Sequence, residues 1–210
     1  MRFRFWWVLA VFGLGCASPQ VAVRKDFDFS KVRRVAVIGF SGPGGDSAAD
    51  LFAQQLLGAG VDVIERQRLE AVLQEQRMGA SGTLSPDTMK KLGMILGVDA
   101  LFMGTVTAYS SAQNYLVYTG GANVVVRDSL TPISGSNVYS RGPSYSPANS
   151  EVLTTSASVG LAARMVDVET GTLLWAANQT YESFDVPGAM TVICSSFVNS
   201  LKPVWPQIYR

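Results

Sequence analysis

The sequence contains no histidine and only two cysteines, Cys16 and Cys194, among its 210 residues. Without histidine, Ser-His-Asp triads and histidine-containing metal sites are excluded. Two cysteines are too few for a cysteine-ligated zinc site, and no G-x-S-x-G nucleophile elbow occurs. The sequence therefore predicts a protein that is not an enzyme, with no catalytic or metal site, no cofactor and no small-molecule substrate.

Positive and negative charges are nearly balanced, with 17 Lys and Arg residues and 16 Asp and Glu residues. The formal net charge of +1 comes without a basic run or tail, so nothing suggests nucleic acid as a partner. Hydrophobic residues make up 48% of the chain, which is enough for one folded domain.

The N-terminus, MRFRFWWVLAVFGLGCAS, carries an apolar segment that is too short to span a bilayer as a stop-transfer helix. Arg2 and Arg4 precede this segment, which covers residues 5–14. A basic start followed by a short apolar stretch is typical of a secretory signal. We therefore expect a lipoprotein signal peptide over residues 1–15, provided that the next residues support lipidation.

Residues 15–18, Gly-Cys-Ala-Ser, resemble the lipobox of bacterial lipoproteins, although Gly13 stands where the motif usually has Leu. The resemblance implies that Cys16 carries fatty acyl chains such as palmitate and that residues 16–30 form a lipidated tether. Acyl chains contribute about 0.8 kcal/mol per buried CH₂, so two or three of them anchor a protein stably. Ala17, where Asp commonly retains lipoproteins in the inner membrane, favours the periplasmic face of the outer membrane. An ordinary secretory signal cut at another small residue is the alternative.

Lipidation of Cys16 would leave Cys194 without a partner for an intramolecular disulfide. Cys194 lies in the apolar stretch AMTVICSSFV, which favours a small buried residue over a reactive thiol.

Residues 31–210 alternate strand-like and helix-like patterns and are expected to form a single periplasmic α/β domain. The order β-α-β-α-α-β-insert-β-β-α predicts a mixed β-sheet flanked by helices. Strands are expected at 32–40, 61–65 and 98–109, a hairpin at 153–184 with its turn at 169–171, and helices at about 46–58, 66–77, 85–97 and 188–201.

Local signals predict how these helices begin and end. Asp46 or Ser47 is the expected N-cap of the first helix. For the helix after residue 84, Ser85 is the expected N-cap, Pro86 fits the first position and Gly97 allows a left-handed stop.

Residues 109–152 form an insertion rich in Ser, Tyr, Gly, Asn and Pro. The stretch from Leu153 to Met165 alternates apolar and small residues, as a membrane-spanning strand does. A soluble loop or an extended periplasmic β-hairpin is the alternative, and the sequence favours it.

Two other segments carry residues that chemistry could use. The turn GFSGPGGDS joins a strand to a helix, as phosphate-binding loops do, but it lacks their Lys-Ser/Thr ending and glycine spacing. Asp46, Asp50, Asp62 and Glu65 fall at the ends of two strand-helix units, where helix caps and solvated rims are favoured over an acid-base or metal cluster.

Four blocks in a fixed order resemble the CsgG family of curli-secretion lipoproteins. They are VAVIGF, VDVIERQRLEAVLQEQ, LGMILGVDALFMGTVTAY and ARMVDVETGTLLWAANQTYES. The resemblance implies a non-enzymatic outer-membrane lipoprotein that acts in assembly or export of a cell-surface or envelope structure. It also implies a homo-oligomer or an envelope protein partner, with a ring-forming secretion pore for curli-like subunits as an alternative.

This sequence departs from the curli channel in two places. Only SGPGGD follows the first strand, which is too short for the family's constriction loop, and only residues 185–187 separate the hairpin from the last helix, which leaves no room for a second membrane hairpin. A weaker similarity, carried by GVDALFMGTV and VDVETGTLLW, links the chain to lipoproteins with a TolB-N-terminal-like domain. That group includes the LpoB type, so an activator of a peptidoglycan synthase is a second alternative.

Overall fold

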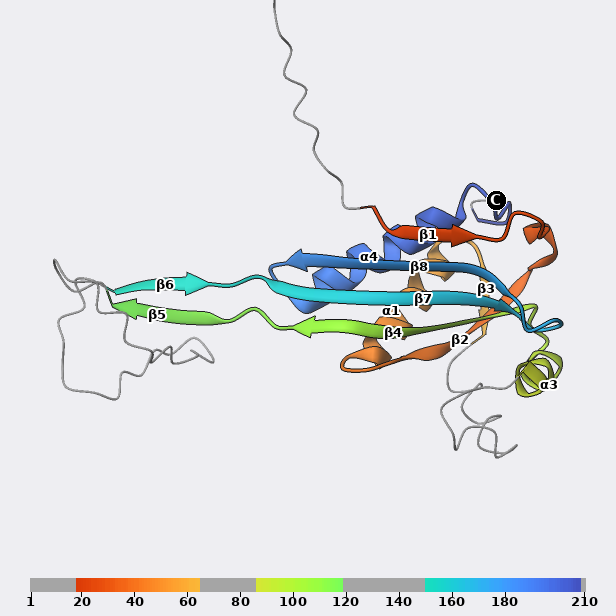
Figure 1. Ribbon diagram of the computed structural model, residues 1–210, viewed down its shortest axis with the longest axis horizontal. Coiled ribbons are helices and arrows are strands. Elements are labelled where there is room, and N and C mark those ends of the chain that lie inside the picture. The colour runs from red at the N-terminus through yellow and green to blue at the C-terminus, as the bar shows by residue number, and fades with distance from the viewer. Residues whose placement is uncertain (1–17, 65–85, 119–149, 209–210) are drawn as a thin grey trace, which may run out of the picture.

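The computed structural model describes residues 18–64, 86–118 and 150–208 (Figure 1). The predicted helix at 66–77, Ser85 and Glu65 lie outside this part of the chain. The described elements are β1 (Gln20–Val23), a 3-10 turn (Phe29–Lys31), β2 (Arg34–Ser41), α1 (Gly45–Gly58), β3 (Asp62–Ile64), α3 (Pro86–Leu96), β4 (Ala100–Ser110), β5 (Asn114–Tyr118), β6 (Ser150–Thr154), β7 (Ala157–Asp167), β8 (Leu173–Ser183) and α4 (Val186–Leu201).

Six strands form one mixed sheet in the order β1-β8-β7-β4-β2-β3. β2 pairs in parallel with β3 and β4, whereas β4, β7, β8 and β1 pair antiparallel in succession. The α/β fold with a helix-flanked mixed sheet, predicted from the sequence, is confirmed. The predicted hairpin is also confirmed, since β7 and β8 pair along their length and join through residues 168–172.

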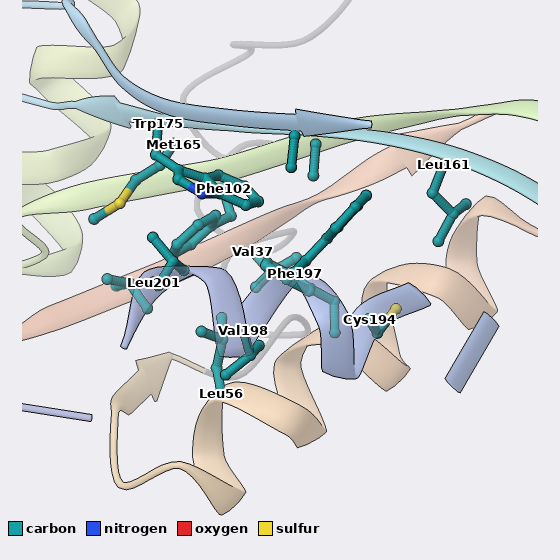
Figure 2. Packing of buried hydrophobic residues seen from close by; sticks show 14 of the residues in the cluster. Val37, Leu56, Phe102, Leu161, Met165, Trp175, Cys194, Phe197, Val198 and Leu201 are labelled. Atoms are coloured by element: carbon teal, nitrogen blue, oxygen red, sulfur yellow. The ribbon is translucent and has the colours of Figure 1, made fainter. Parts of the chain in front are cut away.

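One face of the sheet packs against α1 and α4 (Figures 1 and 2). The Phe102 ring on β4 lies at the centre of this core, 5.1 Å from the Phe52 ring of α1 and 6.1 Å from the Trp175 ring of β8, measured between centroids. From α4, Phe197 contacts the Trp175 ring edge-on at 5.8 Å. Aromatic pairs of this kind add to the stabilisation from burying apolar surface.

The alternating apolar residues of β7 belong to the same core. Val159, Leu161 and Met165 are fully buried and belong to the cluster that also contains the buried residues of α1 and α4. The membrane-strand alternative, which the sequence did not favour, therefore does not apply to residues 157–165. The alternation that suited a membrane strand instead serves a half-covered sheet, because α4 follows β8 directly and supplies the apolar cover.

On the opposite face, α3 covers one end of the sheet. Leu96 and Val98 pack there with Ala36, Leu101 and Val166 in a second buried cluster. The predicted left-handed stop at Gly97 is confirmed, since α3 ends at Leu96 and Gly97 has a φ of 64°.

The folded domain begins at an earlier residue than expected. β1 lies within residues 16–30, the segment predicted to be a tether. β1 pairs antiparallel with β8, with Gln20 opposite Asn178 and Val23 opposite Trp175. Phe29 is also buried. The sheet domain thus begins at residue 20 rather than residue 31. Four residues give too short a pattern for an edge strand to be recognised from sequence.

The start of α1 also differs from the prediction. Neither Asp46 nor Ser47 is its N-cap, because Gly44 occupies that position with a φ of 70° and no side-chain cap. A Cβ on Gly45 would lie 1.9 Å from the Phe40 carbonyl oxygen. Because the backbones pack this closely at Gly45, the helix begins there, before the residues that could cap it with a side chain. The last helix, α4, begins at Val186 and ends at Leu201, within two residues of the expected range.

Candidate functional site

A β-hairpin arm extends from one end of the sheet (Figure 1). β5 and β6 pair antiparallel from Asn114 opposite Thr154 to Tyr118 opposite Ser150. At its base, the Thr155 backbone N–H donates to the Gln113 carbonyl at 2.8 Å, and the Gln113 N–H donates to the Thr155 Oγ1 at 3.1 Å. The ends of the predicted insertion 109–152 therefore form an extended hairpin, as expected. Residues 119–149 lie outside the described part.

A shallow groove of about 520 Å³ lies on the sheet, across β1, β8, β7 and β4. Small side chains leave it open, and Thr105, Arg164 and Asn178 are exposed. The hydroxyls of Ser41 and Thr105 lie 2.9 Å apart at its margin. The groove presents hydrogen-bonding groups and one guanidinium, which suits binding rather than bond cleavage. Its lining residues are Gln20, Val21, Ala22, Gly104, Thr105, Ala162, Ala163, Arg164, Ala176, Ala177 and Asn178.

The three described carboxylates of this set, those of Asp46, Asp50 and Asp62, do not gather with other ligands into a metal-binding group. Asp46 lies in the first turn of α1, and Asp62 begins β3 after that helix ends, so most of the length of α1 separates them. Asp62 Oδ2 accepts a hydrogen bond of 2.7 Å from Arg34 Nε, and both side chains are about half exposed. Such a pair contributes little to stability. These two carboxylates therefore lie on the solvated rim, as the sequence favoured, although Asp46 is not a cap.

The turn considered as a phosphate loop is packed against its neighbours. A Cβ on Gly44 would lie 2.7 Å from the Tyr109 ring and 3.0 Å from Cε of Met190, and one on Gly42 would lie 3.0 Å from the Val106 carbonyl oxygen. Both glycines have positive φ angles. Glycine at these two positions therefore allows the turn to pack closely against β4 and α4. This packing supports a structural connection rather than a phosphate-binding loop.

Cys194 is a buried residue of the core (Figure 2). Its thiol lies 3.8 Å from the Ala48 carbonyl oxygen on α1. Burial raises the pKa of Cys194 to about 12. Because the thiolate is the reactive form, this thiol is chemically inert in the folded protein, in agreement with the sequence interpretation.

Metal-ligand clusters and helices that could span a membrane are both absent from the described residues. No three Asp, Glu or Cys side chains come together there as ligands for a metal ion. None of the helices in residues 18–64, 86–118 and 150–208 is long and apolar enough to cross a membrane.

Sequence reasoning missed the groove and the position of β1. The groove collects residues from β1, β4, β7 and β8 that lie far apart in the chain, so no local motif marks it. An alternation such as Gln20-Val21-Ala22-Val23 before the first long strand is the only signal that could have indicated β1. Cys16 lies outside the described residues, and its lipidation stays a prediction.

Comparison with known proteins identifies one family, described as the curli production assembly/transport component CsgG, which matches residues 9–193. This match supports a role in assembly or export of an envelope structure and a location in the envelope. A search of the curated proteins finds no match to the sequence.

Several solved structures resemble this chain. The PelC dodecamer from Paraburkholderia phytofirmans has a TM-score of 0.45 and 16% identity, over 91% of this chain and 99% of that one. Lipoprotein GNA1162 from Neisseria meningitidis has a TM-score of 0.48 and 18% identity, over 81% and 96%. The LpoB C-terminal domain from Salmonella enterica has a TM-score of 0.42 and 9% identity, over 72% and 83%.

Proposed function

The chain belongs to the CsgG family, and on that premise we propose that it is a non-enzymatic lipoprotein of the outer membrane, facing the periplasm, that acts in assembly or export of an envelope structure. Acyl chains on Cys16 anchor it, and its sheet domain self-associates or docks an envelope protein. The observation that carries this proposal is the family match over residues 9–193.

The position of β1 supports an anchored domain that stays close to the bilayer. Three residues separate Cys16 from Gln20, the first residue of β1. Four Cα–Cα steps span at most about 14 Å. An LpoB-type activator that reaches from the outer membrane to a peptidoglycan synthase needs a longer link, so this alternative is disfavoured.

Chemical features of the chain support a non-enzymatic role. The sequence has no histidine, the Cys194 thiol is inert because of its raised pKa of about 12, and α1 separates Asp46 from Asp62. The groove offers amide, hydroxyl and guanidinium groups, which recognise a partner through hydrogen bonds.

The test compares Cys16→Ala with Cys194→Ala, which makes the same chemical change at the buried thiol. Each variant is expressed in a deletion strain, and palmitate labelling and membrane fractionation are measured. We expect Cys16→Ala to lose the label and leave the outer membrane, whereas Cys194→Ala keeps both. A labelled, outer-membrane Cys16→Ala protein would refute the anchor.

The same strains test the role in assembly. Proteins and polysaccharides extracted from the cell surface are compared between the deletion strain and strains complemented with wild type or Cys16→Ala. We expect only the wild type to restore material that the deletion removes. An unchanged surface in the deletion strain would argue against assembly or export.

The arm favours a second candidate, a secretion pore whose subunits each contribute one hairpin, because β5 and β6 continue the direction of β4 and β7 past the sheet (Figure 1). Ion conductance in planar bilayers that disappears when residues 114–150 are deleted would support the pore. A monomeric protein without conductance would count against it.

A further inference from the structure

Phe184 has the most exposed large apolar side chain of the described residues, at 94%. It lies in the two-residue connection between the end of β8 at Ser183 and the start of α4 at Val186. Exposing a whole phenyl ring to water is unfavourable, so contact of this ring with another apolar phase would stabilise the protein.

A second partly exposed aromatic ring lies at the same end of the sheet. Tyr109 is the penultimate residue of β4 and is 43% exposed. Tyr109 lies opposite Val159 on β7, and Val159 lies opposite Tyr181 on β8, three residues before Phe184. The first residues of α1 and α4 also lie at this end, which is where the arm begins (Figure 1).

The direction of β1 relates this end to the expected anchor. β1 runs antiparallel to β8, and Gln20 lies level with Asn178. Moving from Gln20 toward Cys16 therefore corresponds to moving along β8 toward Ser183. The link reaches about 14 Å at most, whereas the five steps from Asn178 to Ser183 rise about 17 Å. A fully extended link would therefore allow the acylated residue to lie nearly level with Ser183, the residue before Phe184.

Charge at this end does not oppose contact with a membrane as strongly as the sequence suggests. Asp185 Oδ1 accepts a 2.6 Å hydrogen bond from the Gly188 N–H at the start of α4. Asp46 lies in the first turn of α1. Asp46 and Asp185 therefore lie at helix N-termini, where the helix dipole offsets negative charge. The third carboxylate near this end, that of Glu182, is exposed and accepts a 3.3 Å hydrogen bond from Ser156 Oγ.

We propose that Phe184, together with Tyr109, enters the headgroup region of the bilayer beside the acylated Cys16 and orients the arm end of the sheet toward the membrane. This inference rests on the proposed lipid anchor. Acyl chains on a flexible link hold a domain at the surface without fixing its orientation, and a second contact supplies it. Aromatic side chains suit this position because they partition into membrane interfaces.

The experiment places a fluorescent probe at Phe184 and at a matched control position. Leu57 is 64% exposed in the last turn of α1, at the opposite end of the sheet. Phe184→Cys and Leu57→Cys are purified in full-length acylated form, labelled with an NBD maleimide and inserted into phosphatidylethanolamine–phosphatidylglycerol vesicles. Wild type serves as the labelling blank, because Cys194 is buried and the acylated Cys16 is blocked.

We expect NBD at position 184 to show about a twofold rise in emission on vesicles and to be quenched by nitroxide-labelled lipid, since shallow insertion buries the probe. At position 57 we expect neither effect. An acylated protein with no quenching at 184, or with equal quenching at both positions, overturns this inference and leaves the anchor intact. An intact mass without acyl chains overturns the proposed anchor instead, and with it the premise used here.

Discussion

The indole N–H of Trp205 donates a 3.0 Å hydrogen bond to the backbone carbonyl of Val32, and both residues are buried. This contact joins the segment that follows α4 to the segment that precedes β2. The Trp205 ring also stacks near Phe102, with 6.3 Å between centroids. The residues after α4 therefore close the core on the helix-covered face of the sheet.

Replacing Trp205 should destabilise the domain in two steps. Trp205→Phe keeps an aromatic ring but removes the donor to the Val32 carbonyl, so we expect a loss of about 1–3 kcal/mol. Trp205→Ala also leaves a cavity and should cost about 3–5 kcal/mol. The free energy of unfolding in urea measures both. Exposed Leu57→Ala is the control and should stay within about 0.5 kcal/mol of wild type. A Trp205→Phe protein as stable as wild type would contradict the role of the hydrogen bond.

Two glycines of α1 should respond oppositely to alanine. A Cβ at Gly45 would lie 1.9 Å from the Phe40 carbonyl oxygen, whereas one at Gly58 would meet nothing within 4 Å. We expect Gly45→Ala to destabilise the protein by about 1–3 kcal/mol through overpacking. Gly58→Ala should stabilise it by about 0.4–1 kcal/mol, because alanine restricts the unfolded chain. Thermal and urea unfolding of the two variants decide this, and equal effects would refute the close contact.

The sequence predicted the elements whose apolar pattern is long and regular. β7 alternates over Ala157, Val159, Leu161, Ala163 and Met165, and all five are buried. The pattern predicted that one face of this strand is buried, but not whether helices or lipid cover that face. Membrane and helix provide the same apolar contact, so only the position of α4 could decide between them.

Features that depend on long-range contacts were not predictable. β1 forms because β8 offers it an edge some 150 residues later in the chain, with Gln20 opposite Asn178. The N-cap of α1 was predicted wrongly because a local side-chain rule favours Asp46, whereas the contact between Gly45 and Phe40 sets the start of the helix. The groove likewise assembles from distant strands. The lipobox around Cys16 is a local motif, which is why sequence alone suggested it.

Asp185 should stabilise α4 as its N-cap. Its Oδ1 accepts a 2.6 Å hydrogen bond from the Gly188 N–H, and its backbone is extended, with φ of −142°. Asp185→Ala removes this acceptor and should cost about 1 kcal/mol. Asp185→Asn keeps a capping oxygen, and its free energy of unfolding should stay within a few tenths of a kcal/mol of the wild-type value. Urea unfolding compares the two variants. Equal losses for Ala and Asn would show that charge at the helix terminus, rather than the cap hydrogen bond, carries the effect.

Cys194 should make stability decrease at alkaline pH. Burial raises its thiol pKa from 9.0 to about 12. Between these values the unfolded chain loses the thiol proton while the folded protein keeps it. The contribution is therefore fully present below pH 9 and is lost as pH rises toward 12, by at most about 1.4 kcal/mol per pH unit.

Removing the thiol isolates this effect from the titration of Tyr and Lys residues. The free energy of unfolding of wild type and Cys194→Ala is measured from about pH 8 to about pH 11, where only the wild type carries the thiol linkage. The variant starts lower because it loses buried volume next to Ala48, and we expect the two curves to converge as pH rises. Curves that stay parallel across this range would mean that the thiol of Cys194 ionises equally in the folded and unfolded protein, which its burial in the core opposes.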